Sequence, residues 1–294
     1  MGNFANIKDG DELDNKYSGK VIVYVESESD IKLFDKIIGP GFAERLEFKV
    51  PPTGGTGCEP AKKRVLLERP KNDRVYALLD GEVGVSSSDG FERLLSCSST
   101  IFTSGDAELD GIIFLAEHEA ENILLRRADI CAFIASDDSL VKLGRKQEAE
   151  IRLVMETTID HYFKFAVCKY ASARLHFSKQ MDGILDSGLF WQEVSRSKLL
   201  KKIKAKVSDQ NCNWQRFLME LRALQAQIEK YFEEMDDEQR EAERLRLADG
   251  KSAMKKLRVV YKVSPGVEGH LLNEVVKDDY ARQFRQELFD RTAA

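Results

Sequence analysis

The sequence is poor in cysteine and histidine, and neither residue type forms a recognisable metal or redox pattern. Five cysteines are scattered among 294 residues without a CxxC pair, and the four histidines show no HExxH spacing. The chain therefore carries no zinc-binding signature. An odd set of unpaired cysteines is also typical of a reducing compartment, and we expect a cytoplasmic protein.

Long apolar runs and an excess of positive charge are also missing. No apolar run approaches the length of about 18 residues that a membrane-spanning helix requires, and the polar, acidic residues 1–15 do not resemble a signal peptide. The formal net charge of −5 argues against a protein that coats nucleic acid in bulk. It leaves room for a nuclease, because a nuclease needs only a local basic groove.

Nucleotide-binding and nucleophile motifs are absent as well. The glycine-rich segment 53–57 (TGGTG) lacks the Lys-Ser/Thr pair of a P-loop and does not match GxGxxG. It is either a simple strand-to-helix turn or a turn that contacts phosphate through backbone N–H groups. The sequence contains no GxSxG, no Cys–His nucleophile signature and no ATPase motif. The hypothesis that the protein is an enzyme therefore rests on metal and carboxylate chemistry.

Proline is confined to residues 40–70 and to position 265. The six prolines lie at positions 40, 51, 52, 60, 70 and 265, so residues 71–264 contain none. This distribution is expected for an α/β region followed by long helices, and the length suits one large domain or two ordinary ones. We predict an α/β domain over residues 1–135 and a helical domain over residues 136–294.

Strand-like apolar runs alternate with helical periodicity in the predicted α/β domain. The expected strands are 21–25, 46–50, 74–80 and 111–115. The expected helices are 29–38, 60–68, a short helix around 91–95 and a helix from about residue 120. Such alternation predicts a parallel sheet joined by right-handed crossovers. The predicted fold class is α/β, with a parallel sheet flanked by helices and a mainly helical C-terminal half.

The later part of the chain changes to helical spacing. Apolar and aromatic residues recur with this period in segments 151–170 and 214–235, and we interpret them as helix core. The charged segment 236–246 is either a solvated helix or an interaction surface. The most basic stretch, Lys198–Lys206 (KLLKKIKAK), is either one face of a helix or a surface that contacts phosphate.

Three of the predicted strands carry acidic residues at their C-terminal ends. In chain order these residues are Glu26 and Asp30 after VIVYV, Asp80 and Glu82 after VYALL, and the stretch His118–Asn122 (HEAEN) after GIIFL. Parallel α/β sheets place their active sites at this edge. We therefore expect the carboxylates to converge.

Converging carboxylates predict a divalent metal site. Mg²⁺ and Mn²⁺ prefer oxygen ligands, and phosphodiester chemistry uses them to neutralise charge on phosphorus and to activate water. Such a cluster is unfavourable without metal, because like charges raise one another's pKa. Asp80 and Glu82 lie two residues apart at a strand end and can point the same way, toward Glu26 on a neighbouring strand.

Each of these residues also has an ordinary structural interpretation. Asp30 suits a helix N-cap or first turn, and Glu82 suits a solvated loop. Glu119 and Glu121 lie where a helix is expected to start, and the helix dipole favours acids there. His118 is a ligand, a general acid or base, or a packed residue. The joint pattern of three acid-ended strands favours the metal site.

These residues resemble the toprim pattern, in which one strand ends in Glu, an acid follows four residues later, and another strand ends in Asp-x-Asp. The corresponding residues are Glu26, Asp30, Asp80 and Glu82. Ser27 stands where glycine is usual, and Glu82 replaces the second aspartate. HEAEN resembles the HExEN stretch of bacterial toprim proteins that are encoded beside an ABC-like ATPase and are related to the overcoming-lysogenization-defect nucleases. The AriB-like effectors of the PARIS anti-phage system belong to that family.

The resemblance covers residues 20–128 and implies a metal-dependent endoribonuclease. Effectors of this family are held inactive by the partner ATPase AriA and are released when a phage anti-restriction protein is sensed. They then form homodimers and cleave host tRNA in abortive infection, and the resemblance implies that the helical domain over residues 136–294 serves dimerisation and partner contacts. The resemblance implies two Mg²⁺ or Mn²⁺ ions. It assigns catalytic roles to Glu26, Asp80, Glu82, Glu119 and Glu121, with metal ligation by all of these except Glu119.

Two other functions stay open at this point. One is a DNA nuclease of the overcoming-lysogenization-defect type, which would use the same metal chemistry. The other is a non-catalytic interaction subunit that keeps a degenerate toprim fold. Ser27 and Glu82, which depart from the toprim pattern, would support the second alternative.

Overall fold

The computed structural model describes six segments of the chain, and these form two compact units that are each discontinuous in sequence. The described segments are 19–52, 57–87, 89–136, 147–177, 196–263 and 267–292. The sheet unit lies within residues 1–80, 97–116 and 275–294, and the helical unit lies within residues 81–96 and 117–274. Residues 53–56 of the glycine-rich segment lie outside the described residues.

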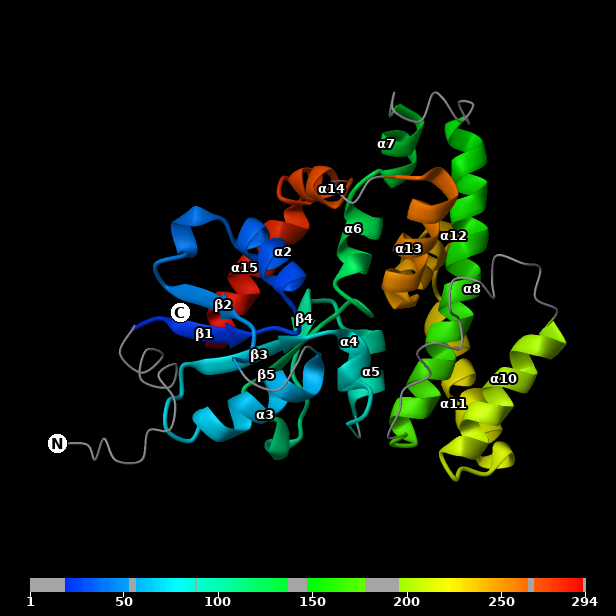
Figure 1. Ribbon diagram of the computed structural model, residues 1–294, viewed down its shortest axis with the longest axis horizontal. Coiled ribbons are helices and arrows are strands. Elements are labelled where there is room, and N and C mark those ends of the chain that lie inside the picture. Colours follow the sequence, from blue (N-terminus) through cyan, green and yellow to red (C-terminus); the bar gives the residue numbers. More distant parts are fainter. Residues whose placement is uncertain are drawn as a thin grey trace. The chain divides into compact units, whose positions relative to one another are not determined.

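A five-stranded sheet forms the centre of the sheet unit (Figure 1). Its strands are β1 (Val21–Tyr24), β2 (Leu46–Lys49), β3 (Val75–Leu79), β4 (Ile101–Phe102) and β5 (Ile112–Leu115), in the spatial order β2-β1-β3-β5-β4. All neighbouring pairs are parallel except β4 with β5, which is antiparallel. The predicted α/β fold class is confirmed, with an antiparallel edge strand that was not predicted.

The position of a strand in the sheet explains how deeply its residues are buried. Every residue of β1 and β5 is buried, as expected for parallel strands that are covered on both faces. Edge strand β2 alternates buried and half-buried residues instead. Strand β4 has only two residues within the polar stretch CSSTIFTS. Two residues are too few for a period to be recognised, so only the tertiary structure reveals this strand.

Helices cover both faces of the sheet, with α2 (Glu28–Ile38) and α15 (Asp279–Thr292) on one side and α3 (Cys58–Glu68) on the other (Figure 1). Two short 3₁₀ helices complete the unit, η2 (Pro40–Phe42) and η3 (Ala107–Leu109). The ring of Phe284 on α15 stacks on Phe34 of α2 at 5.6 Å between centroids. Glu287 accepts hydrogen bonds from the backbone and hydroxyl of Thr100. The C-terminal helix therefore packs within the sheet unit.

The serine that departs from the toprim pattern has a structural role. Ser27 is the N-cap of α2, and its side chain accepts a hydrogen bond from the backbone N–H of Asp30. Its hydroxyl also lies 2.8 Å from the Asp30 carboxylate, to which it donates. Asp30 is thus a first-turn residue, where its charge is favourable to the helix dipole.

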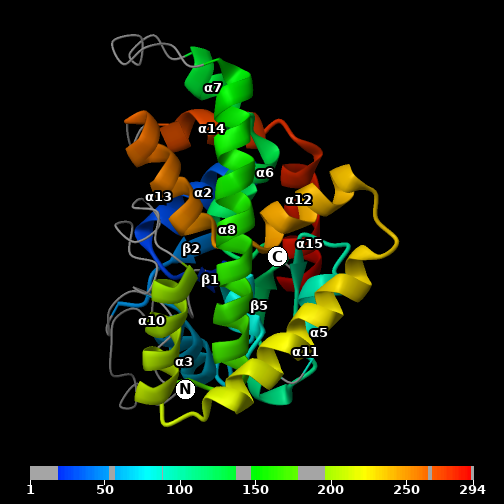
Figure 2. The same cartoon turned by 90° about the vertical axis from the view of Figure 1, so that its right-hand side faces the viewer.

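The helical unit is built around one long helix, α8 (Glu148–Arg174), which α7, α11, α12 and α13 contact (Figure 2). Its helices are α4 (Gly81–Gly84), α5 (Gly90–Ser96), α6 (Glu121–Arg127), α7 (Ile130–Ser136), α8, α10 (Arg196–Asp209), α11 (Trp214–Phe232), α12 (Asp237–Leu247), α13 (Gly250–Tyr261) and α14 (Val267–Val275), the last residue of which belongs to the sheet unit. The predicted helical C-terminal half is confirmed.

The aromatic stripes of the later sequence are helix core, as predicted. Tyr162 and Phe163 on α8 are buried, as are Phe217 and Phe232 on α11. The rings of Phe163 and Phe232 stack at 6.1 Å between centroids and join the two helices. Along the described segments, no helix is both long and apolar enough to cross a membrane.

Candidate metal centre

Three backbone hydrogen bonds assemble the candidate site inside the helical unit. The amide of Gly81 donates to the carbonyl of Glu117 at 3.0 Å, and the amide of Glu82 donates to the carbonyl of His118 at 3.1 Å. The amide of His118 then donates to the carbonyl of Arg246 at 2.9 Å. These bonds hold the first turn of α4, the HEAEN stretch and the end of α12 together.

Asn122, the last residue of HEAEN, fixes the loop that follows α12. Its side-chain oxygen accepts from the amide of Glu119 at 3.0 Å, and its NH₂ group donates to the carbonyls of Leu245 at 2.6 Å and Ala248 at 2.9 Å. Asn122 is fully buried. A Cβ atom at Gly250 would lie 2.4 Å from the Asn122 oxygen, so only glycine fits there. The role of Asn122 is therefore structural.

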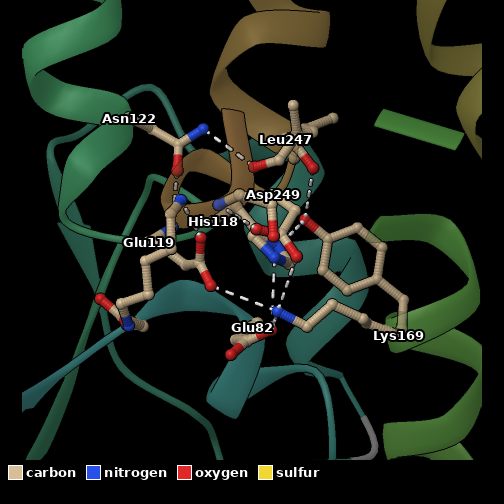
Figure 3. A network of polar contacts seen from close by, with 12 residues as sticks. Glu82, His118, Glu119, Asn122, Lys169, Leu247 and Asp249 are labelled. Atoms are coloured by element: carbon tan, nitrogen blue, oxygen red, sulfur yellow. Dashed lines mark hydrogen bonds and ion pairs between the residues drawn. The ribbon is translucent and has the colours of Figure 1, made fainter. Parts of the chain in front are cut away.

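A buried lysine lies among three carboxylates (Figure 3). Nζ of Lys169, on α8, is 2.9 Å from Oε2 of Glu82, 3.2 Å from Oε1 of Glu119 and 3.3 Å from Oδ2 of Asp249. The Lys169 side chain is only 5% exposed. Because an ammonium group carries three hydrogens and no acceptor, it satisfies one oxygen of each acid. The carboxylates thus surround a single cationic position.

The start of α13 holds two of these acids in place. Asp249 is the N-cap of α13, and its Oδ1 accepts from the amide of Ser252 at 2.8 Å. Oε2 of Glu119 accepts from the amide of Lys251 at 2.7 Å. Both carboxylates therefore lie at the positive end of the helix dipole, which favours their charged form. The other oxygen of each carboxylate, Oε1 of Glu119 and Oδ2 of Asp249, faces Lys169.

His118 completes the cluster and is fully buried. Its Nδ1 lies 2.7 Å from the hydroxyl of Tyr170, which donates to the carbonyl of Leu247 at 3.1 Å. Its Nε2 lies 3.2 Å from Oε2 of Glu82 but has no hydrogen-bond partner of acceptable geometry. The ring is therefore held from one side and presents Nε2 to the carboxylates.

The buried acids have strongly perturbed ionisation. Burial alone would favour neutral Glu82, but the charge of Lys169 outweighs it, and the pKa of Glu82 is lowered well below its usual range. Burial is likewise outweighed at Asp249, where Lys169 lowers the pKa. At Glu119 burial dominates over the opposing effect of Lys169 and raises the pKa to about 7. The cluster therefore carries excess negative charge above pH 7.

The raised pKa of Glu119 predicts a pH-dependent cost to stability. Because its pKa is about 7 when folded against 4.5 ordinarily, the unfolded chain releases this proton first as pH rises. The stability due to Glu119 is complete below pH 4.5 and is lost as pH rises through 7. Relative to a Glu119→Gln variant, the wild type should lose about 2–3 kcal/mol between pH 5 and pH 8.

Urea unfolding at these two pH values in a chelating buffer measures this difference directly. Comparison with Glu119→Gln removes the contributions of the titrating groups that do not interact with Glu119. A stability difference between the two proteins that is the same at both pH values would show that Glu119 ionises normally.

The donor atoms of the cluster fit a divalent cation. Among the described residues, the one group of three metal-ligating side chains with donor atoms within 4.8 Å of one another is Glu82, His118 and Glu119. Two carboxylates and an imidazole are a suitable ligand set for Mn²⁺ and related ions. The buried Nε2 of His118 without a hydrogen bond is the kind of atom that a metal satisfies.

Two other predicted site residues meet in the sheet unit. Glu26 follows β1 and Asp80 follows β3, and the two strands are paired in parallel. The amide of Asp80 donates to Oε1 of Glu26 at 3.3 Å, and the amide of Gly57 donates to the carbonyl of Glu26 at 3.0 Å. The expected proximity of acids at neighbouring strand ends is therefore present for this pair.

The remaining predicted residues belong to the helical unit. Glu82 and Glu119 are both in the lysine-centred cluster. Glu121 is the first residue of α6 and is not part of the three-residue group. Metal binding by Glu26, Asp80 and Glu121, and a single site shared by both sets of acids, stay predictions.

Three residues of the cluster were not foreseen. Lys169 lies between buried Cys168 and Tyr170 on α8, and a lysine on the apolar face of a helix is a signal of a buried charge. Tyr170 was predicted to be part of the helix core. Its hydroxyl also contacts His118, which the helical spacing does not indicate. Asp249 before Gly250 resembles a helix start, and no local pattern links it to Glu82.

Comparison of this chain with models of known protein families, with curated proteins and with solved structures yields no match. Neither Lys169 nor any of its carboxylate partners is therefore assigned a role by a relative. Their chemistry and the motif around Glu26 and Asp80 are the basis for a functional assignment.

Proposed function

We propose that this protein is a metal-dependent endoribonuclease of the toprim type. The observation that carries the proposal is the cationic position surrounded by buried Glu82, Glu119 and Asp249, occupied by the ammonium group of Lys169. Several buried carboxylates around one point are costly in a purely structural role, since each is desolvated and repels the others. Divalent metal chemistry is a function that justifies this cost.

The proposed roles are those that the motif resemblance implies. Glu26, Asp80, Glu82 and Glu121 are proposed metal ligands, and Glu119 is a further acid of the site. When bound, the metal supplies positive charge that stabilises the anionic phosphoryl group in the transition state. Two Mg²⁺ or Mn²⁺ ions would satisfy this many carboxylates.

Within the cluster, the protein side chains hold charge and orientation. Lys169 contributes a fixed positive charge beside Glu82 and Glu119. Its two closest carboxylate partners come from α4 and from the loop before α6, so it also fixes the two backbone segments relative to each other. A positive charge held in a buried site is effective at stabilising developing negative charge.

An exposed basic helix supports a nucleic-acid substrate. On α10, Ile203 and Val207 are buried, while Lys201, Lys202 and Lys204 are exposed. The helix is thus amphipathic, as one interpretation of the basic stretch predicted. Lysines on one exposed face can also neutralise phosphates along a nucleic-acid backbone, which keeps the second interpretation as part of the proposal.

The motif resemblance extends the proposal to a biological role. By analogy with the AriB-like effectors, the protein would be a toxic effector of an anti-phage system that cleaves host tRNA. It would be inhibited by a partner ABC-like ATPase and would act as a homodimer after release. These statements rest on the sequence motifs at Glu26, at Asp80 to Glu82 and at HEAEN.

Incubation of the purified protein with tRNA, supercoiled plasmid and linear DNA tests the activity and its substrate. We expect cleavage of tRNA in Mg²⁺ or Mn²⁺, no cleavage in EDTA, and no cleavage by Glu82→Gln. Glu92→Gln is the matched control, because Glu92 is an exposed acid on α5 of the same unit. It should cleave tRNA at the wild-type rate.

The two alternatives predict different results in the same assay. Metal-dependent cleavage of DNA but not tRNA would identify a DNA nuclease. No cleavage of any substrate, together with no stabilisation by Mg²⁺ or Mn²⁺ in thermal melts, would identify a non-catalytic interaction subunit.

A further inference from the structure

The hydrogen bonds of Tyr170 determine which nitrogen of His118 carries a proton. A tyrosine hydroxyl has one hydrogen to donate, and the carbonyl of Leu247 at 3.1 Å can only accept it. The hydroxyl oxygen of Tyr170 must then accept at its other contact, which is Nδ1 of His118 at 2.7 Å. Nδ1 therefore bears a hydrogen, and in the neutral ring the lone pair is on Nε2.

This lone pair is directed into the carboxylate cluster. Nε2 of His118 is buried without a hydrogen bond, and the nearest carboxylate oxygen, on Glu82, lies 3.2 Å away but off the hydrogen-bonding direction. The donor atoms of His118, Glu82 and Glu119 all lie within 4.8 Å of one another. Nε2 of His118 and the carboxylate of Glu82 are thus two acceptors that face each other in a buried site. A metal ion satisfies both, because it accepts an electron pair from each.

The surroundings of the ring match the support that metal-binding histidines receive. Such histidines usually donate their other N–H to a carbonyl, carboxylate or water, which fixes the tautomer and the ring orientation. Here Tyr170 takes that position, and it is itself anchored to the backbone of Leu247 at the end of α12. The edge of one ring also faces the other, with centroids 5.0 Å apart. Both the hydroxyl and the ring of Tyr170 thus hold the ring of His118.

We propose that His118 binds the metal through Nε2, that Tyr170 is the residue that positions it, and that this nitrogen ligand makes the centre select Mn²⁺ over Mg²⁺. This inference rests on the metal centre of the proposed function and specifies it further. Mg²⁺ is a hard ion that favours oxygen ligands and retains its waters. Mn²⁺ accepts mixed nitrogen and oxygen ligands more readily, and Co²⁺ follows it in the usual order of affinity.

Metal affinity measured by calorimetry, without any substrate, tests the selectivity. The wild type should bind Mn²⁺ at least about tenfold more tightly than Mg²⁺, and Co²⁺ more tightly still. Tyr170→Phe should weaken Mn²⁺ binding by about 10- to 100-fold, the usual effect of removing a residue that orients a metal ligand. Mg²⁺ binding should change much less, so the ratio of the two affinities falls.

Tyr24→Phe is the matched control. Tyr24 is also fully buried, and its hydroxyl is hydrogen-bonded to Glu68 in the sheet unit. Removing that hydroxyl costs a buried hydrogen bond of similar kind but should leave the Mn²⁺ to Mg²⁺ ratio unchanged. A reduced ratio in both variants would point to general destabilisation and would contradict a specific role for Tyr170.

Pulsed EPR provides a second readout that does not depend on Tyr170→Phe. Pulsed EPR of the Mn²⁺-loaded protein should show coupling to an imidazole nitrogen, and His118→Asn should lack it. Mn²⁺ binding without nitrogen coupling, or with the same affinity as Mg²⁺, would overturn the inference about His118 and leave the metal centre standing. Failure to bind Mg²⁺, Mn²⁺ or Co²⁺ at all would overturn the proposed metal centre itself.

Discussion

Replacing Lys169 with methionine is expected to destabilise the metal-free protein by about 3–5 kcal/mol, because removal of one partner leaves buried charges uncompensated. Methionine keeps the length and volume of the side chain, so the packing of α8 is preserved. Glu82, Glu119 and Asp249 would lose the ammonium group that lies within 3.3 Å of each. Urea unfolding at pH 8 in a chelating buffer measures the loss.

A control on the same helix separates the loss of buried charge from the loss of any lysine. Lys164 also lies on α8, but its side chain is 67% exposed and pairs with Asp160 on the surface. Exposed pairs contribute less than about 1 kcal/mol, so Lys164→Met should be nearly neutral. Similar losses for the two variants would show that the cluster does not depend on its internal cation.

Unlike the destabilisation of an ordinary core mutant, that of Lys169→Met should depend on pH and on the presence of metal. Without Lys169 the acids gain protons more easily, so the destabilisation should be smaller at pH 5.5 than at pH 8. Mn²⁺ should restore part of the lost stability, because a cation bound only by the folded state stabilises it. A variant that is equally destabilised at both pH values, and that Mn²⁺ does not stabilise, would argue against a cationic position at this point.

Replacing Glu26 with alanine is expected to abolish tRNA cleavage and toxicity while leaving the fold intact. Loss of a metal ligand should lower activity by more than the roughly 10- to 100-fold that is typical when a residue that orients a metal ligand is replaced. The structural cost should be small, because Glu26 is half-buried and the hydrogen bond that its Oε1 accepts from the Asp80 amide is long, at 3.3 Å. Gel assays of tRNA cleavage, with thermal melts of the same preparations, check both statements.

Glu28→Ala is the control for this experiment. Glu28 is an exposed acid in the first turn of α2, two residues from Glu26, and its removal changes the net charge equally. The control should retain full activity. Retained toxicity in a well-expressed Glu26→Ala protein would disprove the nuclease assignment, and a large loss of stability would favour a structural role for Glu26.

The sheet and the pairing of Glu26 with Asp80 could be predicted because their signals are local. Apolar runs such as VIVYV and VYALL are long enough to identify strands, and parallel neighbours place their C-terminal ends at one edge. Strand β4 and the packing of α15 against α2 depend instead on partners far along the chain. A two-residue strand and a C-terminal amphipathic helix do not encode those partners in their own periodicity.

The sequence by itself determined that acids would follow the strands and that a helical half would come after them, because both depend on residues close together in the chain. Only the tertiary structure decided what surrounds those acids. Lys169 and Tyr170 come from α8, 50 residues or more beyond Glu119, and Asp249 comes from the start of α13. Helical periodicity places Lys169 on a buried face of α8. Only the packing of α8 against the other helices of its unit determines which carboxylates Lys169 contacts.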